Sequence, residues 1–485
     1  MKSTIQNFFV LILLLSCTLS FAQTTQDNTL LTIDRQYSGE FSQDRERDIQ
    51  WDKNGKGYIT IEPSTSMEGV DELVHYTSDL SRSVFVAADQ LADTSESFAI
   101  ESFTLSLDDT KVLLFNNSSK VWRSNTKGDY WVYDKTTKTL EQLGSSFEAS
   151  SLMFAKFSSD NRYVFYVHKF NIYKEDLSTK QITQLTKDGS RDIINGTFDW
   201  VYEEEFGKRD GFSISPSDKL VAFWQLDASS TGTFYMINNT DSIYSRPIPI
   251  QYPKVGDEPS AAKIGIIDLV SKETQWIPIE GGEKENYLPG MQWVNEDLLL
   301  IQQLNRHQNH LTIWSYIPSS QQLKKVYTEK EATWVDIDYP DVSANGWGNN
   351  DLKVVDDKTA FLRMTEGDAW RRIYKVNITT GAKTNLTPFD YDVASMHATT
   401  KKQVYYIASP TNSTQRYLYS VDLKGKGKDR RITPSEFSGL NTYDIGPNGH
   451  YAIHVHQSSQ KVRTVRLISL PDHKVIKVLV DNAAY

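Results

Sequence analysis

The feature that most constrains the fold is a strand–turn–strand pattern that returns along almost the whole chain. In residues 157–167, FSSDNRYVFYV, a polar Ser-Asp-Asn step separates two runs rich in β-branched and aromatic residues, which predicts a β-hairpin. Residues 171–186 follow as a second hairpin that turns at 178–180, so the two hairpins predict one four-stranded sheet. One such sheet cannot bury both of its faces, and its copies must therefore pack against one another.

The same unit is predicted eight times. The copies lie at about 49–98, 103–143, 157–186, 212–278, 287–330, 334–388, 391–438 and 441–480. Four-stranded sheets that stack radially form a β-propeller, for which up to about eight blades is usual. The sequence therefore predicts an all-β fold, an eight-bladed β-propeller over residues 49–482. Residues 24–48 form an N-terminal segment that leads into it.

Residues 1–23 are predicted to be a signal peptide. Lys2 supplies a positive charge, 8–15 form an apolar run, and 19–22 supply small residues for cleavage. The apolar run is too short for a stable membrane span. A lipoprotein signal at 14–17 fits poorly, because a bulky leucine stands where small residues are usual. We therefore expect export to the periplasm or the cell surface without a lipid anchor.

Cysteine content, charge and histidine spacing argue against disulfides, nucleic-acid binding and a metal site. Cys17 is the single cysteine and lies inside the predicted signal peptide, so the exported chain has to be stabilised by core packing and not by disulfides. Removing residues 1–23 takes away Lys2 and no acid, which changes the net charge from −10 to −11. This charge balance argues against binding of nucleic acid, which requires a basic face. The histidines at 307, 310, 450, 454 and 456 lack the pattern of a zinc site, and we expect neither a metal nor a cofactor.

Two segments interrupt the repeat. Residues 187–210 contain the string Asp-Trp-Val-Tyr-Glu-Glu-Glu-Phe at 199–206, whose three adjacent carboxylates repel one another and require solvent or a cation. Such a run is most often a solvated turn, and neighbouring acids cannot straddle a sugar as a glycosidase pair does. Residues 227–262 predict a protruding strand pair that is apolar enough to need a partner surface.

Four stretches resemble the propeller of the dipeptidyl peptidase IV family, in the prolyl-oligopeptidase clan of serine peptidases. They are 199–206 (DWVYEEEF), 252–256 (YPKVG), 121–124 (VWRS) and 478–482 (VLVDN). The resemblance spans nearly all of the chain after the signal peptide. It implies an eight-bladed propeller with a short helical acidic insertion between blades three and four, which projects toward the active site of a hydrolase domain.

The resemblance also implies roles for individual residues. Glu204 and Glu205 correspond to the acidic pair that binds the free N-terminal ammonium of a peptide, and Arg123 to the arginine that contacts a substrate carbonyl. Ser124 departs from the family, which usually has histidine there. Charge agrees with these roles, since two carboxylates bind an ammonium through charge-assisted hydrogen bonds but gain nothing from an internal peptide nitrogen.

The catalytic half is not found in the sequence. The family's serine lies in a G-x-S-x-G motif, and this motif is absent: Gly211-Phe-Ser-Ile-Ser215 fails at its last position. We therefore expect no catalytic residue in this chain, no activity of the chain alone, and the start of a connection to a missing hydrolase domain at 483–485.

Two functions remain open at this stage. One is the substrate-gating propeller of an exported dipeptidyl-peptidase-type exopeptidase that releases N-terminal dipeptides, X-Pro or X-Ala. Its partners are then a peptide with a free N-terminus, the hydrolase domain, and a second copy of the chain bound through residues 227–262. The alternative is a stand-alone propeller that binds peptides or a protein and has no hydrolase. The coding sequence beyond Tyr485 distinguishes the two, because the first requires a G-x-S-x-G motif there.

Overall fold

The computed structural model describes residues 29–91, 98–337, 352–355 and 357–484. The predicted signal peptide lies outside the described residues, as does part of the sixth predicted repeat. The chain divides into two compact units, of which one comprises residues 45–481. In the part of the chain that the structure describes, no helix is both long enough and apolar enough to cross a membrane.

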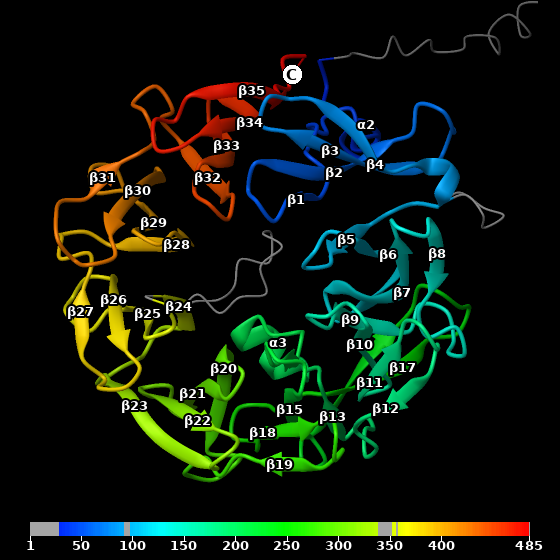
Figure 1. Ribbon diagram of the computed structural model, residues 1–485, viewed down its shortest axis with the longest axis vertical. Coiled ribbons are helices and arrows are strands. Elements are labelled where there is room, and N and C mark those ends of the chain that lie inside the picture. Colours follow the sequence, from blue (N-terminus) through cyan, green and yellow to red (C-terminus); the bar gives the residue numbers. More distant parts are fainter. Residues whose placement is uncertain (1–28, 92–97, 338–351, 356, 485) are drawn as a thin grey trace, which may run out of the picture. The chain divides into compact units, whose positions relative to one another are not determined.

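Residues 45–481 form eight blades of four antiparallel strands, as predicted (Figure 1). The strands of blades one to three are β1 (Ile49–Trp51), β2 (Gly57–Pro63), β3 (Asp71–Thr77), β4 (Arg82–Val86), β5 (Ser102–Leu105), β6 (Lys111–Val121), β7 (Ser124–Asp134), β8 (Thr139–Gln142), β9 (Leu152–Phe157), β10 (Tyr163–His168), β11 (Asn171–Asp176) and β12 (Ile182–Gln184). A 3₁₀ helix, η1 (Ala88–Gln90), follows β4. Blades two and three are joined into one sheet, because β7 pairs with β9 at Gly128 and Leu152.

Blades four to eight continue the same order. Their strands are β13 (Ile193–Asn195), β14 (Phe212–Ile214), β15 (Leu220–Asp227), β18 (Ala261–Asp268), β19 (Thr274–Trp276), β20 (Asn286–Asn295), β21 (Leu298–Asn305), β22 (His310–Ile317), β23 (Gln322–Lys330), β24 (Lys353–Val355), β25 (Ala360–Thr365), β26 (Arg372–Asn377), β27 (Lys383–Asn385), β28 (Val393–Thr399), β29 (Gln403–Ala408), β30 (Tyr417–Asp422), β31 (Arg430–Arg431), β32 (Leu440–Ile445), β33 (Tyr451–Ser458), β34 (Lys461–Ser469) and β35 (Val475–Val480).

The hydrophobic core lies between neighbouring blades, as the repeat requires. Each adjacent pair of blades shares a cluster of buried apolar side chains. The last blade also packs against the first, since Tyr58 of β2 contacts a cluster that contains Ile453 of β33 and Val465 of β34. The Asn448 side chain donates to the backbone oxygens of Asn54 (2.9 Å) and Gly55 (3.0 Å) across the same junction. These contacts close the ring of blades that Figure 1 shows.

Blade four carries both interruptions of the repeat. Its first strand is divided into β13 and β14, which both pair with β15, and the helix α3 (Trp200–Phe206) lies between them. The acidic insertion is therefore helical, as expected, and it interrupts the first strand of blade four instead of lying between blades three and four. Between β15 and β18 the chain forms the arm, a separate pair of strands β16 (Thr233–Asn238) and β17 (Arg246–Gln251). The predicted protruding strand pair is confirmed.

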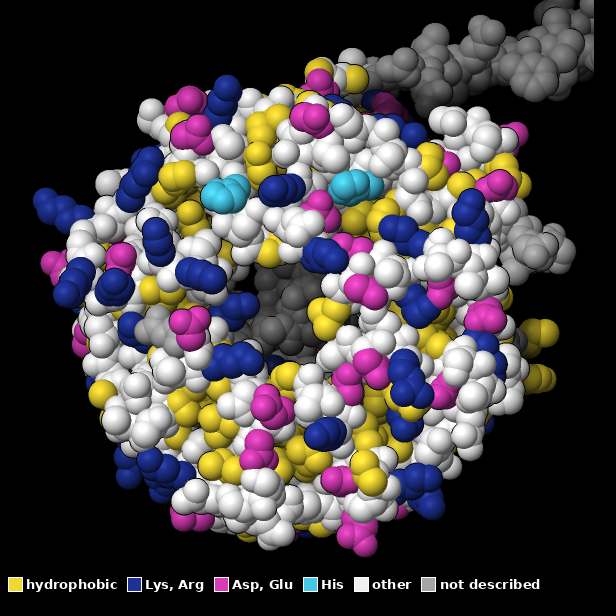
Figure 2. Space-filling model, in the orientation of Figure 1, with side chains coloured by type: hydrophobic (Ala, Val, Ile, Leu, Met, Phe, Trp, Pro, Cys, Tyr) yellow, Lys and Arg dark blue, Asp and Glu magenta, His cyan; other side chains and the backbone are white. Residues whose placement is uncertain are grey.

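The face shown in Figure 2 is hollowed at its centre. Lys and Arg side chains are interspersed there with Asp and Glu side chains, and hydrophobic side chains lie between them. Such a mixture is typical of an ordinary protein surface.

The second unit consists, in its described part, of residues 29–44 and 482–484. It contains the short helix α2 (Ile33–Tyr37), whose N-cap is Thr32. The Asn482 side chain connects its two segments, because Asn482 Oδ1 accepts from the backbone N–H of Asp44 at 2.7 Å and Asn482 Nδ2 donates to the Asp44 oxygen at 3.2 Å.

Candidate functional site

The helix α3 has well-defined signals at both ends. Asp199 is the N-cap, and its carboxylate accepts a hydrogen bond from the backbone N–H of Tyr202 at 2.9 Å. Its other oxygen accepts from the hydroxyl of Ser260 at 2.6 Å. At the other end Gly207 adopts the left-handed conformation (φ 59°, ψ 21°), which favours glycine, and its N–H donates back into the helix. A seven-residue helix is marginal by itself, so tertiary contacts must hold it.

The apolar face of α3 supplies those contacts. Tyr202 and Phe206, four residues apart, lie on one face and are 1% and 2% exposed. The Tyr202 hydroxyl accepts from the backbone N–H of Leu288 at 3.0 Å, and the Phe206 ring packs against Tyr287 at a centroid distance of 5.2 Å. The helix is therefore fixed to the start of blade five, and its acidic residues have defined positions.

The first glutamate of the run is buried and paired. Glu203 Oε1 accepts from Arg209 Nε at 3.1 Å, and the two side chains are only 8% and 13% exposed. Burial raises the pKa of Glu203, while Arg209 and a hydrogen bond from the backbone N–H of Arg123 act in the opposite direction. Glu203 therefore links three segments: the helix, the chain that follows it, and the turn between β6 and β7.

The second and third glutamates face solvent. Glu204 Oε1 lies 3.0 Å from Arg123 Nη2, and the Arg123 side chain is 75% exposed. Glu205 is exposed and makes no ion pair with any residue that the structure describes. It lies close enough to Tyr287 for its charge to add to the increase in the pKa of that phenol, which burial chiefly causes. The structure thus brings Arg123 and Glu204 together although they are 81 positions apart in the sequence, and Glu205 is the next residue of the same helix.

The turn that carries Arg123 is a two-residue β-hairpin turn. Val121 pairs with Ser124 across β6 and β7, so Trp122 and Arg123 alone form the turn. Trp122 has a φ of 54°, a conformation that favours glycine and is costly for a bulky side chain. The turn sets two adjacent side chains on the surface of the blade, and Arg123 is directed to the helix.

A second anchor follows the helix and has no counterpart in the sequence-based prediction. The Lys156 ammonium of β9 forms an ion pair with Asp210 and also donates to the Phe212 oxygen at 2.7 Å. Burial lowers the pKa of Lys156 and raises that of Asp210, and their mutual attraction opposes both changes. The only sequence signal for this anchor and for the Arg209 pair is the Lys-Arg-Asp run at 208–210, separated from the last glutamate by two residues.

The charges of this arrangement would suit the binding of a cation. Glu203 is matched by Arg209 and Glu204 by Arg123, whereas the carboxylate of Glu205 faces solvent beside them. A rigid pair of carboxylates at a solvent boundary binds a primary ammonium through charge-assisted hydrogen bonds. An exposed guanidinium beside the pair can donate to a carbonyl oxygen.

Comparisons with known proteins identify the family. The family model described as "Dipeptidyl peptidase IV (DPP IV) N-terminal region" matches residues 106–462. The chain is similar to dipeptidyl aminopeptidase B of Saccharomyces cerevisiae, with 26% identity over 394 residues that cover 76% of this chain and 45% of that protein. It is also similar to dipeptidyl peptidase 4 of Trichophyton rubrum, with 26% identity over 372 residues that cover 71% and 46% of the two chains. The chain spans about half the length of these relatives.

A solved structure shows the same fold. The crystal structure of Porphyromonas gingivalis dipeptidyl peptidase 4 matches with a TM-score of 0.81 and 22% identity, over 94% of this chain and 62% of that one. Because the family model covers most of the chain and the fold agrees with it, the chain belongs to the dipeptidyl peptidase IV family, as the N-terminal region of such a protein.

Proposed function

We propose that this propeller selects peptides for a serine exopeptidase by binding their N-terminal ammonium at Glu204 and Glu205. The observation that carries the proposal is the placement of Arg123, 3.0 Å from Glu204 on an exposed surface, with Glu205 exposed as the next residue of the helix. Arg123 balances one of the two acids, and a substrate ammonium supplies the second positive charge. In the bound state Arg123 holds a carbonyl of the peptide.

The proposed site explains why an exopeptidase needs a propeller. An internal peptide nitrogen carries no charge and leaves the acids unbalanced, so only a free N-terminus binds well. If a hydrolase domain holds its serine at a fixed distance from this anchor, cleavage falls a set number of residues from the end. Release of N-terminal dipeptides, X-Pro or X-Ala, is the proposed outcome, in an exported protein whose partner is that hydrolase domain.

Direct binding to this chain tests the anchor. The probes are the peptide Ala-Pro-Ala-Ala with a free amine and the same peptide with an acetylated amine. We expect the free amine to bind at least about tenfold more tightly, the effect of one charged hydrogen bond, and Glu205→Gln to remove the difference. Glu273→Gln, an exposed acid on the β18–β19 turn, is the control and should change nothing. Equal affinity for the two peptides would refute the anchor.

Kinetics test the same site in an enzyme that joins this propeller to a hydrolase domain. There Glu204→Gln or Glu205→Gln should each lower kcat/KM. The loss of transition-state stabilisation calculated from the ratio of kcat/KM values should be about 1.5–3 kcal/mol, the range for charged hydrogen bonds. The propeller chain alone should not hydrolyse a Gly-Pro chromogenic substrate. Turnover that a serine-directed inhibitor abolishes would reveal a nucleophile that the sequence does not show.

We further propose that the arm binds a second copy of the chain. Its two strands pair only with each other and carry exposed apolar side chains, among them Tyr235 (61% exposed) and Ile237 (70%). Apolar side chains gathered on a two-stranded ribbon favour burial in a contact between proteins. Residues 227–262 as a whole are the proposed contact.

A further inference from the structure

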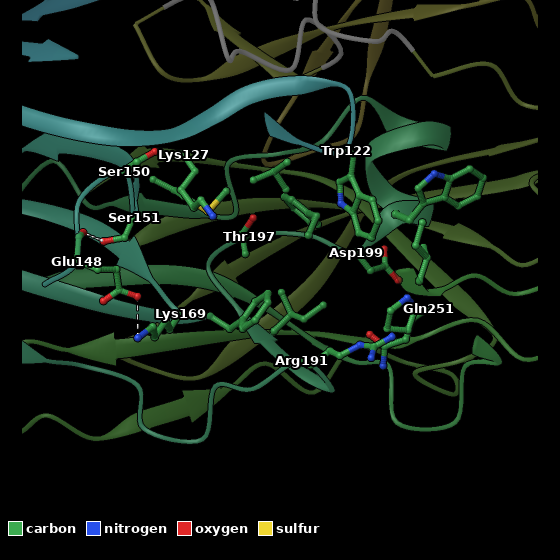
Figure 3. A pocket seen from close by; sticks show the side chains of 18 of the residues that line it. Trp122, Lys127, Glu148, Ser150, Ser151, Lys169, Arg191, Thr197, Asp199 and Gln251 are labelled. Carbon is green, nitrogen blue, oxygen red and sulfur yellow. Dashed lines mark hydrogen bonds and ion pairs between the residues drawn. The ribbon is translucent and has the colours of Figure 1, made fainter. Parts of the chain in front are cut away.

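A cavity of about 390 Å³ lies outside the acidic anchor, where blades two, three and four meet the arm (Figure 3). Neither Arg123 nor Glu204 or Glu205 lines it. Its volume is within the range of pockets that bind small molecules. The cavity is therefore a second place on this propeller where a ligand fits.

The walls of the cavity are largely aromatic and aliphatic. Trp122 comes from the β6–β7 turn and Phe170 from the β10–β11 turn. Phe198 and Trp200 come from the start of α3, and Ile250 comes from β17 of the arm. Side chains from four separate segments thus converge on one apolar space, which favours a ligand with an apolar or aromatic body.

Two of the cationic side chains that line the cavity have no anionic partner among the described residues. Glu148 is paired with Lys169 at 2.7 Å, and Asp199 is occupied by its bonds to Tyr202 and Ser260. Lys127 and Arg191 also line the cavity, and neither side chain has a hydrogen bond or ion pair with any residue in the described ranges. Figure 3 shows these two side chains on opposite sides of the cavity. The cavity is locally cationic in a chain whose net charge is −10.

The backbone around the cavity is strained. Trp122, Ser150, Lys169 and Phe170 all line it, and their φ angles are 54°, 55°, 45° and 62°. The left-handed region is costly for each of these residue types, although hairpin turns elsewhere in the propeller, such as those at Lys138 and Lys272, adopt it as well. The hydroxyl oxygen of Ser150 is buried and finds no hydrogen-bond partner among the described residues.

We propose that this cavity binds a small carboxylate with an aromatic or branched aliphatic body. The apolar walls hold the body, and Lys127 or Arg191 pairs with the carboxylate in a partly desolvated setting, where such pairs are strong. The same chemistry is offered by a free organic acid and by the C-terminal residue of a peptide. The proposal does not depend on the amine anchor, because a ligand of this class needs no free amine.

Calorimetric titration of the full chain tests the proposal with matched pairs of probes. The free-acid pair is 3-phenylpropionate and its neutral amide, and the peptide pair is N-acetyl-Ala-Phe and its C-terminal amide. None of the four carries an amine, so the acidic anchor takes up none of them. We expect at least one acid to bind about tenfold more tightly than its amide, and the pair that shows the larger difference identifies the source.

Variants locate the binding. Lys127→Gln or Arg191→Gln should lower the affinity for the acid about tenfold and leave the amide unchanged. Lys219→Gln, an exposed cation beside the β14–β15 turn, is the matched control and should have no effect. Equal binding of acid and amide in the unmodified chain, or no binding of either acid below about 10 mM, would overturn the proposal without reference to any variant.

Discussion

The pair of Glu203 with Arg209 provides a sharp test of how the acidic helix is held in place. The proposed perturbation is Arg209→Met, which keeps much of the apolar length of the side chain and removes its charge. Since the two side chains are 8% and 13% exposed, the variant leaves a carboxylate buried without its cation. Breaking a buried pair in this way costs about 3–5 kcal/mol.

Protonation of Glu203 limits this cost and gives it a pH dependence. Burial already raises the pKa of Glu203, and Arg209 is the strongest influence that opposes the rise, so the variant moves this pKa further up. Each pH unit below the new pKa then relieves about 1.4 kcal/mol of the penalty, until the pH reaches the ordinary pKa that Glu203 has in the unfolded chain. We expect a loss of about 2–4 kcal/mol at pH 8 and a clearly smaller loss at pH 6.

Hydrogen exchange of the backbone amides of residues 199–211 measures this loss, because the opening is local to the helix and the chain that follows it. The double variant Glu203→Gln with Arg209→Met should lose less than Arg209→Met alone, since a neutral amide still accepts from the Arg123 N–H. Arg246→Met is the control, as its pair with Asp241 is 62% and 50% exposed and such pairs contribute about 0–1 kcal/mol. A double variant less stable than Arg209→Met, or a loss that is independent of pH, would refute the reasoning.

Three further outcomes are expected. Burial lowers the pKa of His454 from 6.5 to about 2. Between these two pH values only the unfolded chain protonates this imidazole, so the free energy of unfolding should fall by at most about 1.4 kcal/mol per pH unit as the pH drops below 6.5. His454→Gln should flatten the dependence of the melting temperature on pH, and an unchanged slope would contradict this origin. Gly207→Ala forces a φ of 59° on alanine and should lower the hydrogen-exchange protection of α3 by about 1–2 kcal/mol, whereas unaltered protection would show that the cap is relaxed. Tyr235→Glu with Ile237→Glu should convert a dimer into a monomer in light scattering, and a monomeric unmodified chain would exclude the arm as a dimer contact.

The fold could be predicted from the sequence because its information is local and repeated. Each hairpin, such as the one at residues 157–167, has its own turn residues and its own period-two pattern, and the structure has strands there, β9 and β10. The two interruptions were found for the same reason, since they break a regular spacing. The divided first strand of blade four was not visible, because β13 and β14 are only three residues each.

The site was only partly predictable, because its geometry depends on contacts between distant segments. The string of three glutamates does not reveal that Glu203 is buried and that its neighbours are exposed. That difference follows from the phase of a seven-residue helix whose Tyr202 and Phe206 pack on blade five. The cavity was not predicted at all, since its walls come from separate segments between residues 121 and 251 and form no local pattern.

Three adjacent glutamates have three different environments in this structure, and this explains why a charge run of this kind can be rigid. Glu203 uses its carboxylate to bind Arg209 and the backbone of the β6–β7 turn, so it brings the turn to the helix. This β6–β7 turn places the Arg123 guanidinium next to Glu204, and Glu205 remains exposed to solvent. A Glu203→Gln variant should therefore weaken the binding of a free N-terminus although the side chain at this position never touches the peptide, and the loss should be smaller than that of Glu205→Gln.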